Sequence, residues 1–271
     1  MLKCPVCGKV LEGEPGRFVC ENRHSFDRAA NGYVNLLLPN RGAGNHGDSK
    51  EMLRARRSFL EKGYYANLSG ALCRLVLEES RRPLRVLDCC CGEGYYTNAL
   101  RRALEEAGAE FTLAAFDISK NAARMAASKE NPVQYFAASV FDIPVEDGWA
   151  DIALHSFAPY CDAEIARVLS PGGLLFGVLP GRRHLYGLKE VLYDRPYEND
   201  ETGYESERLK FLRDLRLCGT IHLACPEDIQ SLFWMTPYCW RTPEAGVKRM
   251  QALAELHTET EFLIRILQKP E

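Results

Sequence analysis

Three cysteines and a histidine near the start of the chain have the spacing of a metal site. Cys4, Cys7, Cys20 and His24 form the pattern C-x2-C-x12-C-x3-H. Three thiolates and one imidazole complete the tetrahedral coordination of a structural zinc ion and leave no position for a reacting water. The surrounding segment is short and polar, so it needs the metal to fold. Because only three residues separate Cys20 from His24, we expect a ribbon or knuckle rather than a DNA-reading finger.

A second group of residues that could do chemistry follows an apolar segment. Arg85 to Leu87 leads into Asp88, three cysteines and Gly92-Glu93-Gly94, after which an amphipathic helical pattern begins. A strand, a glycine-rich turn and a helix in this order form the first unit of a doubly wound, nucleotide-binding sheet. Acidic side chains in the turn repel the two phosphates of NAD but attract the positively charged sulfonium of S-adenosylmethionine. The turn therefore favours a methyltransferase over a dehydrogenase.

Asp117 is a further candidate for cofactor binding. It ends a second apolar segment, Phe111 to Phe116, and lies 23 residues after Gly94. In doubly wound folds, an acidic residue at about this distance meets the hydroxyl groups of the ribose. We therefore expect Asp117 to contact the cofactor.

Alternating strand and helix patterns position these residues and set the fold class. Further strands are predicted at Val133–Ala137, Asp151–Phe157 and Leu174–Leu179, and late strands at Leu215–Leu223 and Phe262–Leu267. Repeated strand–helix units imply a parallel sheet with its ligand at the carboxyl ends of the strands. The sequence predicts an α/β protein in which a Rossmann-like class I methyltransferase sheet of seven strands follows a small N-terminal zinc ribbon.

Composition divides the chain into three parts. Residues 1–39 form the zinc-binding ribbon, which an apolar patch from Gly32 to Pro39 is expected to close. Residues 40–82 contain a glycine-rich linker and connecting helices, with a helical pattern from Ser49 to Leu60. Residues 83–271 form the methyltransferase domain, with a substrate insertion expected near 187–216.

Charge is divided unevenly along the chain. Residues 1–62 hold 11 basic and 7 acidic residues, whereas the remaining 209 residues hold 23 basic and 30 acidic ones. A basic head on an acidic body suits a docked polyanion, with Arg54, Arg56 and Arg57 as phosphate contacts. A merely solvated helix face produces the same pattern.

Cysteine usage and hydropathy indicate the compartment. The chain has 11 cysteines, three of them consecutive, which suits no disulfide framework. It shows no run of 18 apolar residues and no secretory pattern. We expect a soluble cytoplasmic protein with no membrane partner.

Several segments, in one order along nearly the whole chain, resemble a known family. They are the zinc set, GYVNLL, ARRSFLEKGYY, CGEGYYT, GRRHLYGLK and MTPYCWR. Together they look like the bacterial 23S ribosomal RNA guanine-N1 methyltransferases of the RlmA type. The turn Ser170 to Leu174 also resembles the one before the fifth strand of S-adenosylmethionine-dependent methyltransferases.

The resemblance implies a reaction, partners and site residues. The chain would transfer a methyl group from S-adenosylmethionine to N1 of a guanine in a hairpin of domain II of 23S ribosomal RNA, and would act as a homodimer. Zinc would be held by the four residues of the pattern above. The cofactor would be contacted by Tyr65, Gly92, Glu93 and His184.

One departure from the family pattern D-x-G-x-G-x-G lies in the turn. Cys90 replaces the first glycine, and Cys91 follows it. A side chain at position 90 is expected to crowd the cofactor or to change the turn, and so to reduce affinity.

Proton removal and base recognition are left open by the sequence. N1 of neutral guanine carries a proton, and Asp142, His155 and Tyr160 are only guesses for its acceptor because they lie near predicted strand ends. Met235 to Arg241 combines two rings and a cation, which suits stacking on an extruded base, but Trp240 could equally pack in the core. Two rival functions stay open: a small-molecule methyltransferase whose ribbon serves dimerisation, and a non-catalytic RNA-binding adaptor disabled by Cys90.

Overall fold

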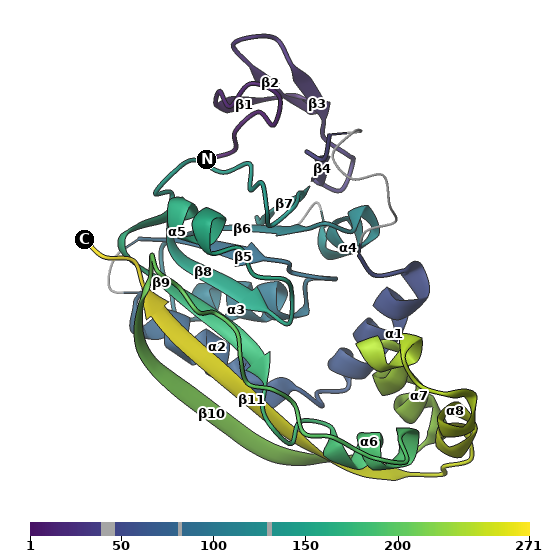
Figure 1. Cartoon of the computed structure of the whole chain (residues 1–271). Coiled ribbons are helices and arrows are strands. Elements are labelled where there is room, and N and C mark those ends of the chain that lie inside the picture. Colours follow the sequence, from purple (N-terminus) through teal and green to yellow (C-terminus); the bar gives the residue numbers. More distant parts are fainter. Residues whose placement is uncertain (39–46, 81–82, 129–131) are drawn as a thin grey trace.

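The computed structural model describes residues 1–38, 47–80, 83–128 and 132–271, and most of the expected linker, residues 40–46, lies outside these ranges. A small sheet contains β1 (Leu11–Glu14), β2 (Arg17–Cys20) and β3 (Ser25–Asp27) (Figure 1). A large mixed sheet contains, in spatial order, β10 (Lys210–Leu223), β11 (Leu256–Gln268), β9 (Leu169–Pro180), β8 (Ala150–Ser156), β5 (Leu84–Cys89), β6 (Phe111–Asp117), β7 (Gln134–Ala137) and β4 (Val34–Asn35).

The large sheet confirms the predicted Rossmann-like fold. Neighbouring strands from β9 to β4 are parallel, whereas β11 is antiparallel to both β9 and β10. The order reverses at β5, which has β6 on one side and β8 on the other. β10 and β11 each begin several residues earlier than predicted, because charged residues such as exposed Arg213 and half-buried Glu259 interrupt their apolar pattern.

The apolar patch expected to close the ribbon, which the structure describes over residues 32–38, bridges to the end of the ribbon through Val34 and Arg28 and also joins the large sheet. Val34 and Asn35 form β4, which pairs in parallel with β7 at the edge of the large sheet. Val34 and Leu36 are buried in a cluster that includes residues of that sheet. A three-stranded ribbon has no interior that could bury these side chains, so the larger sheet receives them.

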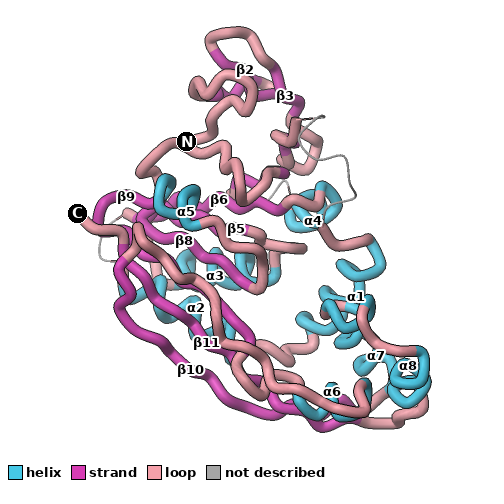
Figure 2. The backbone as a smooth tube through the Cα atoms, viewed as in Figure 1, coloured by secondary structure: helices cyan, strands magenta, loops and turns pink. Residues whose placement is uncertain are grey.

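Two apolar cores lie on the two faces of the sheet. Along β5, Leu84 and Val86 belong to one core, whereas Leu87 and Cys89 belong to the other, as the two-residue period of a strand requires. α2 (Ala66–Glu78) and α3 (Tyr95–Glu106) cover the first face (Figure 2). α5 (Asp162–Val168) and the ribbon cover the second, and α4 (Lys120–Ala126) follows β6.

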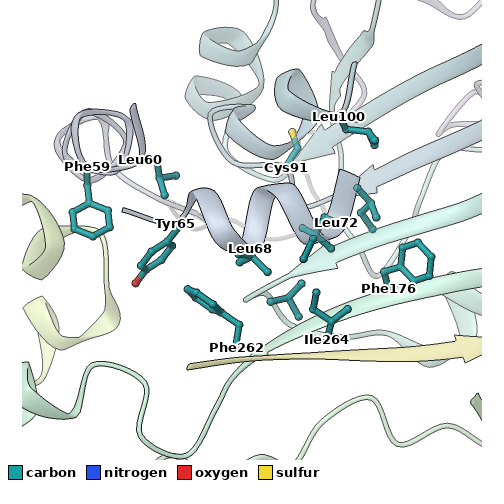
Figure 3. Packing of buried hydrophobic residues seen from close by; sticks show 14 of the residues in the cluster. Phe59, Leu60, Tyr65, Leu68, Leu72, Cys91, Leu100, Phe176, Phe262 and Ile264 are labelled. Atoms are coloured by element: carbon teal, nitrogen blue, oxygen red, sulfur yellow. The ribbon is translucent and has the colours of Figure 1, made fainter. Parts of the chain in front are cut away.

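The predicted helix after the linker is confirmed as α1 (Lys50–Glu61). The Ser49 hydroxyl accepts the backbone N–H of Met52 at 3.2 Å and caps its N-terminus. The apolar residues predicted for one face, Met52, Leu53, Phe59 and Leu60, are all buried. Figure 3 shows Phe59 and Leu60 beside Tyr65 at one end of the first core.

A layer of helices lies beyond the carboxyl ends of the parallel strands (Figure 1). It contains α6 (Tyr186–Leu192), α7 (Pro226–Trp234), the 3-10 helix η1 (Pro237–Trp240) and α8 (Glu244–Gln251), and α1 packs against α7. The region expected as the substrate insertion, 187–216, contains most of α6, a loop over 193–209 and the start of β10. The insertion between β10 and β11, residues 224–255, was not predicted, because its short helices lack long apolar periods.

The ribbon is fixed to the body through the first residues of the chain. The amino group of Met1 pairs with Glu146, Leu2 bridges to Val145, and the N–H of Lys3 donates to the carbonyl of Pro144 at 2.9 Å. Leu2 is buried in the core on this face. Among the described residues, no helix is both long and apolar enough to cross a membrane.

Candidate functional site

The four predicted zinc ligands lie together at the base of the ribbon. His24 Nδ1 is 3.5 Å from Cys4 Sγ and 3.4 Å from Cys20 Sγ, and the sulfurs of Cys7 and Cys20 are 3.7 Å apart. Tetrahedral zinc with ordinary bond lengths places sulfur and nitrogen ligands about 3.6 Å apart and two sulfurs about 3.8 Å apart. The backbone N–H of Lys9 lowers the pKa of the Cys7 thiol to about 6, which favours the thiolate. The donor set therefore fits a closed, structural zinc ion.

A cavity of about 630 Å³ opens at the carboxyl ends of β5, β6 and β8. This is the edge where doubly wound sheets bind ligands, beside the strand at which their order reverses. The cavity brings together all five residues expected to contact the cofactor: Tyr65, Gly92, Glu93, Asp117 and His184. Residues of α1, the loop 193–209 and the segment 235–241 complete its wall.

The turn after β5 keeps a left-handed backbone despite its cysteine. Cys90 has φ +63°, and Gly92 and Gly94 have φ +57° and +87°. A left-handed residue other than glycine costs about 1–2 kcal/mol, so the fold holds Cys90 in the conformation that a glycine would adopt freely. A Cβ at Gly94 would lie 2.8 Å from Cβ of Ala126, so only glycine fits there. Cys90 lines the cavity without deforming the turn.

Asp117 holds this turn with both carboxylate oxygens. Oδ2 accepts the N–H of Gly92 at 2.9 Å, and Oδ1 accepts the N–H of Ser119 at 2.8 Å. Burial raises the pKa of Asp117, and the two backbone donors act in the opposite direction. Each oxygen keeps a further lone pair for a ligand hydroxyl.

Asp88 is buried at the end of β5. It accepts a hydrogen bond from Thr97 Oγ1 at 2.5 Å, and burial raises its pKa to about 7. A carboxyl held near its pKa at neutral pH becomes ionised when a cation arrives. Asp88 therefore suits a positively charged ligand.

Arg56 and Arg57, which were expected to contact phosphates, pair with carboxylates that line the cavity. Arg57 Nε pairs with Glu93 Oε2 at 3.0 Å, and its guanidinium also donates to the carbonyls of Glu93 and Met125. Arg56 pairs with Asp48 and donates to the carbonyl of Met235 at 3.3 Å. The helical period places both side chains on the flank of α1 that meets the turn, which a charge count along the sequence does not reveal.

Tyr65 and His184 form a neutral pair on another wall. The Tyr65 hydroxyl lies 3.2 Å from His184 Nε2, and His184 Nδ1 accepts the N–H of Glu261 at 3.2 Å. Because Nδ1 is an acceptor, Nε2 carries the proton and donates to Tyr65, whose own hydrogen is left for another acceptor. Burial lowers the pKa of His184 to about 3 and raises that of Tyr65. The pair offers an uncharged O–H donor to an anionic group of a ligand.

The structure does not support the three guesses for the proton acceptor, because none of them lines the cavity. Asp142 is exposed and lies beside the ribbon, near Cys4. His155 is buried, donates from Nε2 to the carbonyl of Pro159, and has its pKa lowered to about 4 by burial. Tyr160 donates to Asp162 at 2.8 Å. Proximity to a strand end was too coarse a criterion to identify a base.

Exposed aromatic side chains line the cavity or are adjacent in sequence to residues that line it. Trp240 is 69% exposed, so the alternative that it packs in the core is wrong. Phe157 lines the cavity, is exposed, and holds a left-handed φ of +55°. Tyr197 and Arg241 also line the cavity. Exposed rings and a cation beside a largely apolar cavity that also holds carboxylates suit an unstacked nucleobase.

The fold and the two sites define a class: an S-adenosylmethionine-dependent methyltransferase with a zinc-ribbon head. The family description "RlmA, N-terminal" matches residues 2–41, and "Methyltransferase domain" matches residues 86–173. A "23S rRNA (guanine(748)-N(1))-methyltransferase" from Streptomyces fradiae is 34% identical over 269 residues, which cover 96% of this chain and 93% of that protein. The chain belongs to the family of the 23S rRNA (guanine-N1)-methyltransferases.

Two further relatives carry names for the same activity without a numbered guanine. The protein from Bacillus subtilis is 28% identical and the alignment covers 97% of this chain and 96% of that protein. The protein from Micromonospora griseorubida is 30% identical, with 96% and 94% covered. In all three cases the similarity includes the ribbon and the helical layer as well as the sheet.

Proposed function

We propose that this chain methylates N1 of guanine 748 of 23S ribosomal RNA. The observation that carries the choice of guanine is the 34% identity with the Streptomyces fradiae protein along almost the whole of both chains. The open cavity with exposed rings among its lining residues supports a large substrate whose base enters while the rest stays outside.

Different residues of the cavity would contact different parts of the cofactor. Asp117 would accept the ribose hydroxyls through its remaining lone pairs. The Tyr65 O–H, set by His184, would donate to the carboxylate of the methionine end, and Glu93 and the turn at Gly92 would border the same ligand. The bound cofactor supplies an electrophilic methyl group, and the protein's contribution is chiefly alignment.

Two rival functions make different demands on the structure. A small-molecule methyltransferase has no use for an open, ring-lined cavity, and sites for small ligands bury most of their ligand. A non-catalytic RNA-binding adaptor requires that Cys90 distort the cofactor-binding turn after β5. Instead, Cys90 keeps the left-handed backbone conformation of the glycine it replaces. Both observations support the catalytic RNA enzyme.

The assembly and the compartment are part of the same proposal. We propose a homodimer, as the family resemblance implies, located in the cytoplasm, as the cysteine usage and hydropathy indicate. Sedimentation of the zinc-loaded chain tests the dimer, and a monomer at micromolar concentration would contradict it.

Mapping of the modified base tests the proposed reaction. N1-methylguanine cannot form a Watson–Crick pair, so reverse transcriptase should stop beside guanine 748 of 23S rRNA from cells with the gene and read through in cells without it. Mass spectrometry of the excised hairpin should show one additional methyl group on a guanine base. A stop at another guanine would overturn the position, and unchanged RNA in both strains would overturn the reaction.

A further inference from the structure

The reaction needs an acceptor for the N1 proton, and the cavity offers five carboxylates. Four of them already have protein partners: Asp48 with Arg56, Glu93 with Arg57, Asp88 with Thr97, and Asp117 with two backbone N–H groups. The fifth is Asp200, in the loop 193–209.

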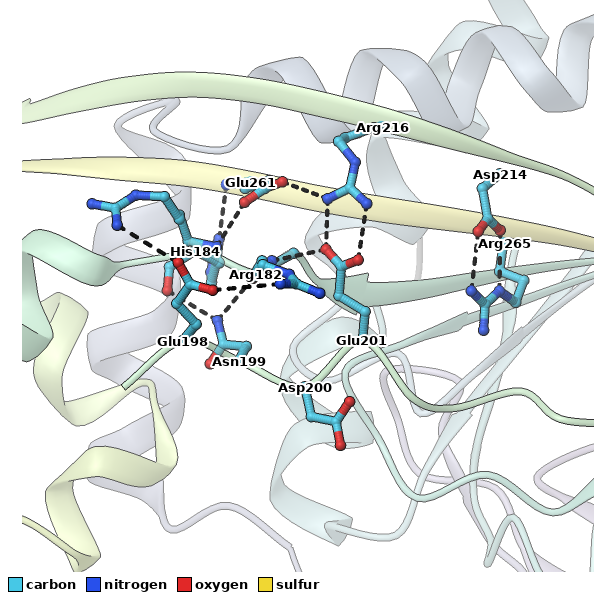
Figure 4. Close-up of polar contacts among 12 residues, drawn as sticks. Arg182, His184, Glu198, Asn199, Asp200, Glu201, Asp214, Arg216, Glu261 and Arg265 are labelled. Carbon is cyan, nitrogen blue, oxygen red and sulfur yellow. Dashed lines mark hydrogen bonds and ion pairs between the residues drawn. The ribbon is translucent and has the colours of Figure 1, made fainter. Parts of the chain in front are cut away.

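Asp200 lines the cavity and is exposed. Its recorded hydrogen bond is to the backbone N–H of Thr202 at 3.2 Å, and no lysine, arginine or histidine among the described residues pairs with it. Figure 4 shows its carboxylate turned away from the ion pair of Glu201 with Arg216. A carboxylate with one backbone donor keeps most of its acceptor capacity for a ligand.

The loop holds Asp200 in place through the residues on both sides of it. Asn199 donates from Nδ2 to the carbonyls of Gly181 and His184, and its Oδ1 accepts from buried Lys189 Nζ at 2.6 Å. Glu201 Oε1 accepts the N–H of Arg182 at 2.9 Å. The backbone on either side of Asp200 is thus pinned to the wall that carries His184, while its own carboxylate is available.

We propose that Asp200 binds the Watson–Crick edge of the target guanine and accepts its N1 proton. This inference rests on the proposed function. The lone pair at N1 takes the methyl group, the electrons of the broken carbon–sulfur bond stay on sulfur, and the N1 proton passes to the carboxylate and then to water. Guanine offers N1–H and N2–H side by side to a carboxylate, whereas adenine presents an acceptor at N1.

The experiment compares Asp200→Asn with Asp194→Asn in the zinc-loaded full chain. Asp194 lies in the same loop, is exposed, pairs with Arg249 and does not line the cavity. Single-turnover methylation of the 23S hairpin should fall by about 10²–10⁴-fold in Asp200→Asn, as expected for loss of a general base. Its rate should then rise with pH, as guanine ionises unaided, while S-adenosylmethionine affinity stays within twofold of the Asp194→Asn value.

Binding provides a readout that does not depend on turnover. With S-adenosylhomocysteine present, wild type and Asp194→Asn should prefer a hairpin with guanine at the target position over one with adenine, and Asp200→Asn should lose this preference. An Asp200→Asn rate within threefold of Asp194→Asn, or equal loss of cofactor binding, would overturn the assignment. A wild-type chain that methylates no RNA would instead overturn the proposed function.

A separate observation, where β10 ends and β11 begins, indicates a second metal site. His222 and His257 are directly opposite in the register of β10 and β11, and their rings are stacked with centroids 4.1 Å apart and an interplanar angle of 2°. Glu255 Oε2 lies 2.8 Å from His222 Nε2, and one ligand atom from each of the three residues lies within 4.8 Å of the others. All three side chains are exposed and can turn toward one ion.

We infer that His222, Glu255 and His257 bind a divalent transition metal such as zinc or nickel. Two imidazoles and one carboxylate are the ligands that these metals accept, and solvent can fill the remaining positions. The three residues lie at the two ends of the insertion 224–255, so the ion would clamp the base of the segment that carries Trp240. This site differs from the zinc site of the ribbon because its three ligands are exposed, so the bound ion can exchange with solvent.

Titration of the zinc-loaded chain with nickel chloride tests this site. Calorimetry at pH 7.5 should show one equivalent bound, with binding weakened at least tenfold in His257→Ala. Thr220→Ala, an exposed neighbour on the same strand, should bind as wild type does. No heat above that of buffer, or unchanged affinity in His257→Ala, would overturn the assignment.

Discussion

Burial of charged residues around the cofactor cavity determines how the free protein responds to pH. Asp88 is the clearest case, because it is buried and its pKa is raised to about 7 from an unfolded value near 4. A carboxyl whose folded-state pKa is raised contributes stability below the unfolded pKa, and this contribution is lost as pH rises through the folded pKa. The free chain should therefore lose stability between about pH 4 and pH 7.

Asp88→Asn removes this titration while keeping the shape of the side chain. The free energy of unfolding of the variant, relative to wild type, should increase between pH 5 and pH 8 by roughly 2–3 kcal/mol, because the unfolded carboxyl is already mostly ionised at pH 5 and the folded one titrates near pH 7. Urea unfolding at the two pH values measures the difference. A constant difference between variant and wild type would show that Asp88 ionises normally in the folded chain.

Arg57 supports the cofactor turn through Glu93, whereas Arg54 on the same helix is exposed. Arg57→Ala leaves Glu93 buried without its cation and frees two backbone carbonyls. Loss of a hydrogen-bonded charged partner is worth about 1.5–3 kcal/mol, so S-adenosylmethionine affinity should fall by at least about tenfold.

Arg54→Ala is the matched control for this change. It removes one positive charge from α1 without touching the turn, so calorimetry should give a dissociation constant within twofold of wild type. Equal effects of the two substitutions would show that the cofactor responds to the net charge of α1 and not to the Arg57–Glu93 contact.

At the scale of elements, docking of the loop 193–209 depends on a glycine in β9. The ring of Tyr204 lies where a Cβ of Gly177 would be, at 2.7 Å, and its hydroxyl donates to Nδ1 of His155 at 2.6 Å. Tyr204 is buried in the second core, on the face of the sheet that α5 and the ribbon cover. The position of the loop that carries Asp200 is thus tied to the centre of the sheet.

Gly177→Ala should displace Tyr204 and loosen this loop. Overpacking a close-packed core typically costs about 1–3 kcal/mol, and the cost should appear as a lower urea midpoint and faster proteolysis between residues 193 and 209. Gly70→Ala is the control, because its Cβ would meet only the flexible end of Arg74 at 3.5 Å, and alanine favours the helix. If both variants were cut at the wild-type rate, Tyr204 would not anchor the loop.

Elements with strong local signals could be predicted from the sequence. The buried parallel strands read as apolar segments, α1 showed its period and cap, and the zinc ligands had a diagnostic spacing. The five expected cofactor contacts meet in one cavity, although two of them came only from the family resemblance and lie far from the turn in sequence: Tyr65 and His184.

Features that depend on tertiary contacts could not be predicted. β4 joins a strand about 100 residues away, and nothing in Val34-Asn35 indicates this partner. The direction of the Arg57 side chain depends on where α1 docks, and the position of Asp200 depends on hydrogen bonds made by its neighbours in a loop with no period.

At the scale of the whole molecule, the charge count overstated how basic the head is. The ribbon proper, residues 1–38, holds five basic and four acidic residues, and Lys9 and Arg17 pair with Glu21 and Glu14. Much of the excess lies on α1, where Arg56 and Arg57 are neutralised by carboxylates. Net charge therefore gives little support to a role of the ribbon itself in RNA binding, and such a role would have to rest on its shape and position.

The zinc site and the body share one apolar core, so loss of the metal should affect both. Cys4, Leu11 and Cys20 are buried in the same cluster as Ile143 and Val145 of the body. Cys20→Ser should lose the zinc ion, lower the melting temperature of the whole chain and weaken binding of the 23S hairpin, because the ribbon cannot fold without metal. S-adenosylmethionine affinity should change little, since none of the residues lining the described cavity comes from the ribbon.

Cys218→Ser separates metal loss from the chemistry of the substitution, because Cys218 is an exposed residue of β10 far from the ribbon in sequence. Zinc content, melting temperature and RNA affinity of this control should match wild type. The informative comparison is the ratio of the two affinities in Cys20→Ser: RNA binding should fall at least tenfold more than cofactor binding. An equal fall in both would mean that the ribbon stabilises the cofactor cavity itself through the shared core, and full RNA binding without zinc would remove the ribbon from substrate recognition.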